Sequence, residues 1–544
     1  MRVGPVLALV TAIVAPASAA AAPPDVIRTG GPSRPPDAKV AVVATAKPTA
    51  GKRFRVLDSV GATVLSGKLT RAPGKATPWK RATLADLSAV TAPGTYRVVA
   101  GKLRSRPWVV ADDAASGAIA AMVQFFAANN DGNEPSPVHR PAHLNDAQIA
   151  SGPYAGQHFD LTGGWMDAGD MVKFTQTIGH SAAMLQAAAR LDPSQADVLN
   201  ATADVGVRWL VKAHPMPDLF IAQVGDERDH DVSFRDPAKD DASTLPGIGT
   251  RQAYPALGSD LAGKAAAALA MAADRTTPGP DRDVLVAQAR GWYEMGGATE
   301  KPLKGLAGAF YESTSYIDDM AAGAAALYRT TGDPQYLTDA LDYLNGAELD
   351  AGFTWSEFAA FAAADLCGVL GAPGAADEAG RMRACGLLTN AGQGGVDRAR
   401  TDAFGMPASF GWGVTAESSA AGVAGVLAER AGVLAGGARM GAIARDYLLG
   451  RNPWGASFIV GFGPRSARHP HHWASVFGAV KPIGAVVGGP APAKAVKDQK
   501  VPLPRNPYNS PRAVYTDNKE NYVTSEPAID YTADSILLLA ALAR

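Results

Sequence analysis

The chain has 544 residues and a formal net charge of −1. This length is sufficient for two domains with sizeable cores. The near-neutral charge gives no electrostatic reason to expect a nucleic acid or a membrane surface as a partner. We therefore expect neither a nucleic acid nor a membrane as a partner. We also expect the protein to be a monomer.

The first 22 residues have the pattern of a secretory signal peptide. Arg2 supplies the positive charge, residues 6–14 form an apolar run, and Ala-Ser-Ala at 17–19 is a small-residue cleavage site. The run is too short to span a bilayer, and no other stretch is long and apolar enough. The sequence predicts a secreted protein.

Only two cysteines, Cys367 and Cys385, are present. In an oxidising compartment they could form a disulfide, but two free buried thiols are equally compatible with the sequence. A zinc site built from cysteines is not supported.

The N-terminal fifth of the chain contains two segments of different composition. Residues 23–38 are a Pro-rich connector, and residues 39–111 contain short β-like runs separated by glycine and proline turns. Short strands at regular spacing predict a small β-sandwich. Nothing in this domain has a catalytic pattern, so we expect a structural support rather than a sugar-binding module.

Residues 112–544 follow a helical period, with about eleven or twelve helices and no convincing strands between them. Long loops in a compact domain are usually functional. A ring of helix pairs would gather such loops into one cleft. The predicted loops are 130–165, 225–258, 391–412, 451–480 and 485–528.

The segment 163–174, Gly-Gly-Trp-Met-Asp-Ala-Gly-Asp-Met-Val-Lys-Phe, carries two carboxylates three residues apart, Asp167 and Asp170. Two acids held close repel, so their proton affinities separate, which suits a general base that activates water. Taken alone, the pattern also fits an Asp-rich helix cap or turn. Glu526, near the C-terminus, supplies a second acidic element. Hydrolysis of a glycosidic bond needs such a base and acid.

Five segments follow one another along the chain: 163–174, 212–230, 448–453, 469–472 and the segment around Glu526. In sequence and in order they resemble glycoside hydrolase family 9, the inverting β-glucanases that include many cellulases. The resemblance covers nearly the whole mature chain, and residues 25–111 resemble the immunoglobulin-like domain of one branch. It implies a multidomain protein, with a small all-β immunoglobulin-like sandwich (39–111) followed by an all-α (α/α)6-barrel catalytic domain (112–544).

The resemblance assigns the base to Asp170 and the acid to Glu526. Asp167 would hold the same water and keep Asp170 ionised. Pro527 and Ile529 give Glu526 a partly apolar setting, which would raise its pKa. The competing interpretation of Glu526 is an acid that caps the C-terminal helix.

Three further residues, His230, His471 and Tyr531, match family positions that bind sugar hydroxyls. The histidine run 469–472 could also be read as a metal cluster, but its Pro-containing surroundings favour a hydrogen-bonding loop. Sugars present flat apolar faces to aromatic rings. Of the tryptophans beside predicted loops, we expect only Trp412 to be such a platform.

The chain departs from the family pattern at several positions. Trp473 stands where an arginine is usual, Ser525 and Thr532 replace asparagines, and Met171 replaces a histidine. These changes leave the three acids intact but alter the expected sugar contacts. They put plain cellulose in doubt as the preferred substrate.

A structural calcium site is expected near Thr314, Asp318 and Asp319, because family members often bind calcium at a matching segment and adjacent acids suit that ion. The alternative is a solvated helix N-terminus. His139 and His143 lie where the family can hold zinc, but no cysteine accompanies them, so zinc is not expected.

The sequence therefore predicts a secreted inverting glycoside hydrolase acting on β-1,4-glucan or a related plant polysaccharide, with no cofactor required for the reaction. One alternative is an exo-acting β-glycosidase on another β-linked sugar, such as glucosamine oligomers. The other is a sugar-binding protein without catalysis.

Overall fold

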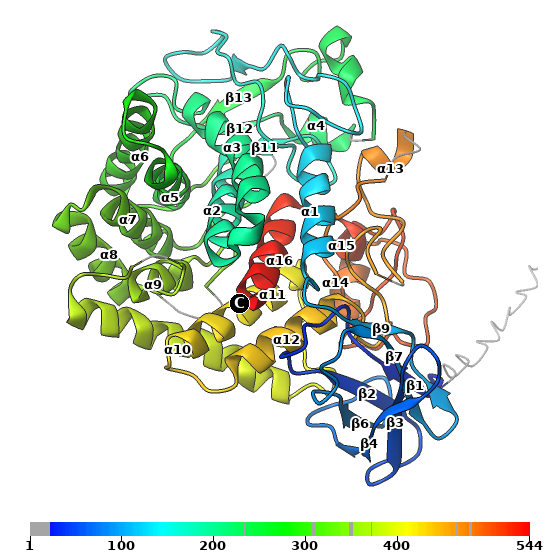
Figure 1. The fold of residues 1–544 in the computed structure, drawn as a ribbon. Helices are drawn as coiled ribbons and strands as arrows, with labels where there is room; N and C mark the ends of the chain where they lie inside the picture. Colours follow the sequence, from blue (N-terminus) through cyan, green and yellow to red (C-terminus); the bar gives the residue numbers. More distant parts are fainter. Residues whose placement is uncertain are drawn as a thin grey trace, which may run out of the picture.

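An N-terminal β-sandwich is followed by a helical domain (Figure 1). Within the described part of the chain, no helix is both long and apolar enough to cross a membrane. The predicted signal peptide lies outside that part, apart from residue 22. This computed structural model describes residues 22–232, 234–306, 310–347, 352–371, 373–463, 465–477 and 481–543.

The sandwich consists of two antiparallel sheets, with strand orders β1-β2-β6-β5 and β4-β3-β7-β8, and with β9 paired to β7. Inward-facing Val43, Phe54, Val98 and Trp108 form its core. The strands are β1 (Val26–Arg28), β2 (Val40–Thr45), β3 (Arg53–Leu57), β4 (Thr63–Lys68), β5 (Thr70–Arg71), β6 (Arg81–Asp86), β7 (Gly94–Ala100), β8 (Leu103–Arg104) and β9 (Trp108–Val110).

The sandwich begins earlier than the sequence indicated. Strand β1 lies inside the segment predicted to be a connector and pairs with β2 through Val26 to Arg28. A three-residue strand flanked by prolines and glycines is too short to show an alternating pattern. The segment 23–38 is therefore partly integrated into the first sheet.

Six helices contact one another in a closed ring, from α2 through α5, α7, α9, α11 and α16 back to α2. Figure 1 shows α16 between α2 and α11, and it contacts both of them. These helices are largely buried. They are rich in alanine and glycine, which lets them pack closely. They are α2 (Thr175–Leu191), α5 (Ser259–Arg275), α7 (Ile317–Thr331), α9 (Ala359–Cys367), α11 (Val414–Arg430) and α16 (Ile529–Leu542).

A second set of helices packs outside this ring, for example α3 on α2, α6 on α5 and α8 on α7. The two sets alternate along the chain. The outer helices are α1 (Ser116–Ala128), α3 (Ala196–Lys212), α6 (Pro280–Thr299), α8 (Pro334–Gly346), α10 (Glu378–Arg400) and α12 (Gly437–Leu448). Short helices occupy the loops: η1 (Pro193–Gln195), α4 (Glu227–Asp231), η2 (Pro237–Ala242), α13 (Ala474–Phe477), α14 (Ala493–Asp498) and α15 (Tyr522–Ser525).

The predicted loop 391–412 is wrong over its first half, because α10 continues to Arg400. Its glycines suggested a loop, since glycine disfavours helices. In the structure they permit close packing: a Cβ on Gly392 would lie 3.2 Å from the carbonyl oxygen of Ala424, and one on Gly395 would lie 3.1 Å from the Cβ of Ala421. The glycines are contact points between α10 and α11.

The expectation of no strands in the helical domain is also wrong. A small four-stranded sheet, in the order β10-β13-β12-β11, lies among the loops. Strands of two to four residues give no periodic signal in a sequence. They are β10 (Gln148–Ile149), β11 (Lys173–Phe174), β12 (Ile221–Val224) and β13 (Gln252–Pro255).

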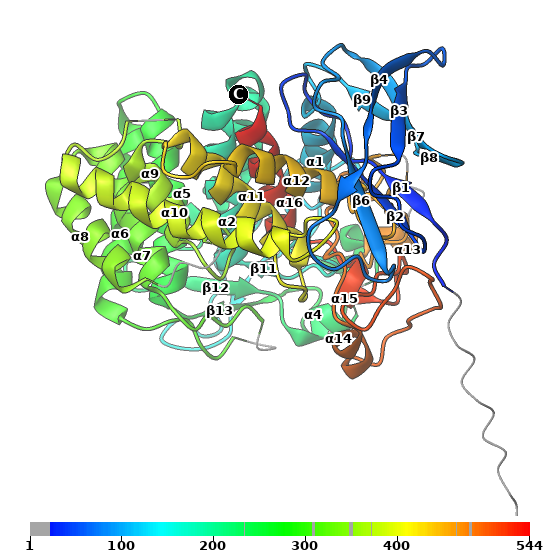
Figure 2. The same cartoon turned by 90° about the horizontal axis from the view of Figure 1, so that it is seen from below.

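The sandwich lies beside α12 in both views (Figures 1 and 2). Charged groups join it to the helical domain. The guanidinium of Arg28 donates to the carbonyl of Pro453 at 2.8 and 3.2 Å. Asp37 forms an ion pair with Arg445, whose guanidinium also binds Asp446 at 2.9 Å.

The two cysteines form a disulfide, Cys367–Cys385, which joins the end of α9 to α10. The alternative of two free thiols is therefore excluded. Disulfides persist mainly in oxidising compartments.

Candidate active site

The loop bearing Asp167 and Asp170 folds back on itself just before α2. The backbone N–H of Asp167 donates to the carbonyl of Val172 at 3.0 Å, and the N–H of Val172 donates to Asp170 Oδ1 at 3.0 Å. Strand β11 follows at once and pairs with β12, which leads into α4. The unpredicted sheet therefore brings α4 beside the loop.

His230 comes from α4 and contacts Asp170 directly. Its Nδ1 lies 2.6 Å from Asp170 Oδ2. The Asp170 side chain is 7% exposed and that of His230 is 38% exposed, so the pair opens towards solvent. Asp170 thus has one oxygen anchored by backbone and the other beside an accessible imidazole.

Asp167 has a different environment, because hydroxyl groups bind both of its oxygens. Thr177 donates to Oδ1 and Tyr311 donates to Oδ2, each at 2.5 Å. Burial, and then the nearby charge of Asp530, raise the pKa of Asp167 well above its usual value. The sequence analysis missed both hydroxyl donors. Tyr311 follows a glycine-rich stretch, with Phe310 before it, and this aromatic pair was the available signal.

Glu526 meets the aspartate loop from the opposite end of the chain. Its carboxyl group lies against the backbone of Gly169, because a Cβ built on Gly169 would be 2.8 Å from Glu526 Oε1. Burial raises the pKa of Glu526 to about 8, and the charge of Asp170 acts in the same direction. Glu526 lies before α16, as a capping acid would, but its carboxyl group is directed to the aspartate loop. The structure therefore brings all three predicted acids together.

Gly169 is required at this junction. A Cβ there would lie 2.5 Å from the carbonyl oxygen of His471 and 2.8 Å from Glu526 Oε1. The carbonyl of Gly169 also accepts from the N–H of Trp473 at 2.9 Å. No side chain fits between the aspartate loop and the segment that carries His471.

We expect Gly169→Ala to displace Glu526 or the His471 segment and to lower kcat by about 10²-fold, because small misplacements of catalytic groups are costly. Steady-state kinetics on a soluble glucan would measure this effect. Gly156→Ala is the control, since a Cβ there meets nothing within 4 Å although its φ of +80° adds local strain. If G169A and the unsubstituted protein had the same kcat, Gly169 would not be required between Glu526 and the His471 segment.

Four aromatic side chains, Phe234, His471, Tyr522 and Trp412, follow one another beside Glu526. The ring centroids are 4.8 Å apart for Phe234 and His471, and 5.6 Å apart for each of the next two pairs. Trp412 is 46% exposed. Two predicted sugar contacts, His471 and Trp412, thus belong to one partly exposed aromatic row.

Tyr531 lies within this site as well. Its hydroxyl lies close to Gly413, the neighbour of Trp412. A Cβ built on Gly413 would be 2.8 Å from the Tyr531 hydroxyl oxygen. Burial, followed by the charges of Asp530 and Glu526, raises the pKa of Tyr531. His230, His471, Tyr531 and Trp412 therefore surround the three acids.

A second aromatic row was missed by the sequence analysis. Phe310 lies 5.1 Å from the ring of His230, and Trp355 lies 5.0 Å from the ring of Tyr311. Trp355 is half-buried. The acids thus have aromatic side chains on both sides, which suits a ligand with flat apolar faces.

Trp473 does not contribute to these rows. It is fully buried and packs with Met166, Met171 and Ala474. Two departures from the family pattern, at positions 171 and 473, therefore form one apolar cluster behind the aspartate loop. Trp473 does not replace the usual arginine as a donor to the sugar.

The histidine run 469–472 is not a metal cluster. His471 Nδ1 lies 2.6 Å from the carbonyl of Lys519, and His472 Nε2 lies 2.9 Å from Asn129 Oδ1. Over the described ranges, no group of three or more His, Cys, Asp or Glu side chains could hold a metal ion. The imidazoles serve in separate hydrogen bonds.

The expected calcium ligands do not fit a calcium site. Asp319 Oδ1 lies 2.5 Å from the ammonium of Lys264, and both side chains are buried. Asp318 Oδ2 accepts the backbone N–H of Phe358 at 2.7 Å, whereas Thr314 is exposed. A lysine already supplies the positive charge that calcium would bring, so this prediction is not supported.

Arg251 is the centre of a buried ionic network beneath the site. Its guanidinium donates to Asp146 at 2.6 and 2.9 Å and to Asp131 at 3.0 Å. It also donates to the carbonyl of Met171 at 2.5 Å and to Asp229 at 3.0 Å. Met171 follows Asp170 in the chain and Asp229 precedes His230, so Arg251 holds the backbone on both sides of the Asp170–His230 contact.

His143 belongs to the same network and not to a zinc site. It lies between Asp131, at 2.7 Å, and Asp240, at 3.0 Å. Although burial and Arg251 act against it, these carboxylates raise the pKa of His143 to about 9. A protonated imidazole cannot bind a metal.

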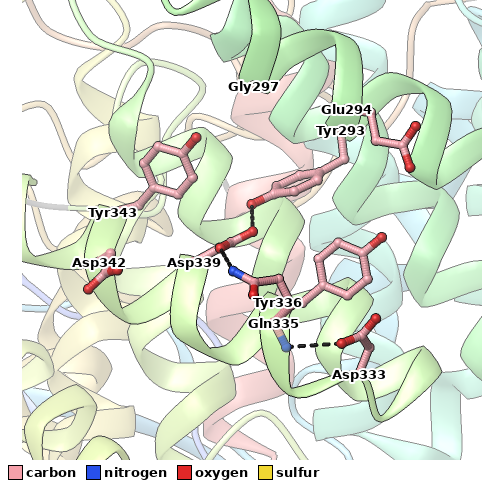
Figure 3. A pocket seen from close by; sticks show the side chains of 9 residues that line it. All are labelled: Tyr293, Glu294, Gly297, Asp333, Gln335, Tyr336, Asp339, Asp342 and Tyr343. Atoms are coloured by element: carbon pink, nitrogen blue, oxygen red, sulfur yellow. Dashed lines mark hydrogen bonds between the residues drawn. The ribbon is translucent and has the colours of Figure 1, made fainter.

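A separate cavity of about 590 Å³ lies between α6 and α8 (Figure 3). Tyr293 donates to Asp339 at 3.0 Å, and Gln335 donates to the other oxygen of Asp339 at 2.7 Å. These polar groups satisfy one another, and none of the three acids described above lines the cavity. The chemistry is not located there.

Comparisons with known proteins identify the family of both domains. Residues 116–539 match the sequence profile of Glycosyl hydrolase family 9, and residues 34–105 match that of the Cellulase N-terminal ig-like domain. Endoglucanase 14 of Arabidopsis thaliana is 29% identical over 78% of this chain and 93% of its own length. Endoglucanase 5 of the same plant is 30% identical over 77% of this chain and 72% of its own length.

Solved structures show the same fold. A single-mutant thermostable endoglucanase from Alicyclobacillus acidocaldarius superposes with a TM-score of 0.80 at 23% identity, over 96% of this chain and 100% of the other. The structure of AaCel9A in complex with cellobiose-like isofagomine superposes with a TM-score of 0.79 at 24% identity, over 95% of this chain and 99% of the other. Both likenesses span the sandwich and the helical domain.

Proposed function

Because this chain belongs to glycosyl hydrolase family 9 and is therefore a glycoside hydrolase, we propose that it is a secreted, inverting endo-β-1,4-glucanase. Its similarity to plant endoglucanases supports a β-1,4-glucan or a related plant polysaccharide as the substrate. The closed ring of helices with an outer set supports an (α/α)6 barrel. The disulfide supports export to an oxidising compartment, and we expect a monomer.

In this proposal Asp170 is the general base. Its carboxylate, next to the accessible His230, would take a proton from the attacking water. Glu526 would give its proton to the leaving glycosidic oxygen, because a carboxyl with a pKa of about 8 is protonated at neutral pH. Asp167, held by Thr177 and Tyr311, would orient the water and the loop.

The observation that carries the proposal is the contact of Glu526 with Gly169, inside the loop of the two aspartates. It supports a protonated carboxyl and a second acid at one partly exposed site, the arrangement that glycosidases share. Proton NMR of the first product from a β-linked oligosaccharide tests inversion. We expect the α-anomer first, and initial release of the β-anomer would exclude the inverting mechanism.

We expect kcat/KM to fall about tenfold per pH unit above roughly pH 8. The folded-state pKa of Glu526 lies above the ordinary 4.5, so the acid form persists at neutral pH and is lost as pH rises through about 8. An aryl cello-oligosaccharide with a phenol of high pKa provides the measurement. A dinitrophenyl glycoside is the control, because its leaving group needs no protonation and should lack this limb.

An exo-acting enzyme on glucosamine oligomers remains a second candidate, favoured by the burial of Trp473 at the position of the usual arginine. Such an enzyme would release single sugars without lowering the viscosity of a soluble glucan. Parallel measurement of reducing sugar and viscosity on carboxymethyl cellulose and chitosan distinguishes the two activities. A chain that only binds sugar would release nothing from either polymer.

A further inference from the structure

A cavity of about 240 Å³ lies where the β-sandwich meets the helical domain, separate from the acids of the active site. Val40 and Leu84 enter it from β2 and β6, and Val396, Met440 and Ile443 from the helical side. The backbones of the two domains join at its edge, because the N–H of Ala403 donates to the carbonyl of Lys75 at 3.0 Å. The cavity is therefore preformed and its walls are mostly apolar.

Arg451 lines this cavity with an under-satisfied guanidinium. The residue is 2% exposed, and its Nη2 donates only to the carbonyl of Ile443, at a long 3.3 Å. Its Nε is buried and has no hydrogen-bond partner. A buried charged donor without a protein partner is unfavourable, so a ligand that accepts a hydrogen bond from Nε would be favoured here.

The acids near Arg451 are engaged with other arginines. Asp446 binds Arg445 at 2.9 Å, and Asp402 binds Arg512 at 2.9 Å. Neither carboxylate makes a direct ion pair with Arg451 among the contacts of the described residues.

The remaining lining adds positive charge. Arg400 and Arg439 also line the cavity, whereas Asp402 is its only acid. Arg400 already pairs with Asp397 at 3.3 Å, so Arg439 and Arg451 against one neutralised acid favour an anion. The apolar walls favour a ligand with a hydrophobic body.

We propose that this cavity binds a small organic monocarboxylate, whose carboxylate pairs with Arg451 and whose apolar part lies against Val40, Leu84 and Met440. Arginine binds carboxylates through two parallel N–H···O bonds, which would supply the partner that Nε lacks. The cavity is smaller than a drug-sized site of about 300–1,000 Å³, so the ligand is fragment-sized. Because both domains line the cavity, the ligand would stabilise their contact.

The test is thermal unfolding of the full chain with 3-phenylpropanoate, its neutral amide and chloride. We expect the carboxylate alone to raise Tm, by about 2 °C near saturation. An equal shift with the amide would overturn the role of Arg451. An equal shift with chloride would overturn the role of the apolar walls, and no shift with the carboxylate would overturn the proposal altogether.

Two variants locate the binding. In Arg451→Met we expect the carboxylate shift to disappear while the unliganded Tm stays equal or rises, because removing a buried unpaired charge is often neutral or stabilising. Ala399→Phe fills the cavity from its half-buried edge and leaves Arg451 in place, so calorimetry should detect no binding even if R451M does not fold. Arg81→Met, on the surface of the sandwich, is the matched control and should retain the shift. Binding that persists in A399F would refute the proposed location.

Discussion

Replacing Glu526 by Gln should lower kcat on a polysaccharide by about 10³-fold while binding of a cello-oligosaccharide persists. The amide fits the same space beside Gly169 but has no proton to transfer to the leaving oxygen. Replacing Asp170 by Asn should have at least as large an effect, because the base and its contact with His230 are both lost. Initial rates and isothermal calorimetry measure the two quantities separately.

The matched control is Asp342→Asn, a carboxylate-to-amide change at an exposed position in the α6–α8 cavity. It should leave kcat unchanged. For E526Q a dinitrophenyl leaving group should restore much of the rate, since departure of that group needs no acid. Full activity of E526Q on the polysaccharide would remove Glu526 from the mechanism.

Replacing Arg251 by Leu should lower the free energy of unfolding by about 3–5 kcal/mol, because it leaves several buried carboxylates without their partner. The donors to Asp131, Asp146 and Asp229 all disappear together. Activity should fall more than stability alone explains, since Arg251 also fixes the carbonyl of Met171 beside Asp170. Denaturant unfolding and kcat measured well below the midpoint separate the two effects.

Arg208→Leu is the control, because Arg208 pairs with Glu134 at 2.7 Å on the surface with 55% of its side chain exposed. Such pairs contribute about 0–1 kcal/mol. Arg251→Lys should rescue only part of the loss, since an ammonium cannot reproduce a forked guanidinium. If R251L were as stable as R208L, the network would not support the site.

The pair Asp167 and Asp170 could be proposed from sequence because the suggested chemistry depends on residue type and local spacing. Asp167 and Asp170 lie on one side of the chain if the segment turns as a helix start does. Glu526 was tied to them only through the resemblance, since no local pattern reveals a contact over more than 350 positions. The structure shows this contact where Glu526 packs against Gly169.

The residues that hold the acids were not predictable in the same way. Thr177 and Tyr311 donate to Asp167, and Arg251 braces the loop, yet each comes from a different segment. A lone threonine, tyrosine or arginine carries no spacing signal. The calcium prediction is not confirmed, because Lys264, far from Asp319 in sequence, supplies the counter-charge of Asp319 in the core.

Helix prediction failed where glycine has a packing role. In α10 the glycines at 392 and 395 read as loop residues, but they let α11 approach closely. Intrinsic propensity and tertiary contact oppose each other at such positions, and the contact prevails. The β10–β13 sheet was missed because its pairing joins distant short segments.

The salt bridge of Asp37 with Arg445 makes the sandwich inseparable from the helical domain by simple truncation. Cutting the chain at residue 39 would remove Asp37, together with the guanidinium of Arg28 that holds Pro453. Arg445 would then keep only Asp446, at 2.9 Å, as a carboxylate partner. Any exchange of N-terminal modules between relatives must therefore carry the preceding proline-rich segment, because the boundary of cooperative structure lies near residue 26.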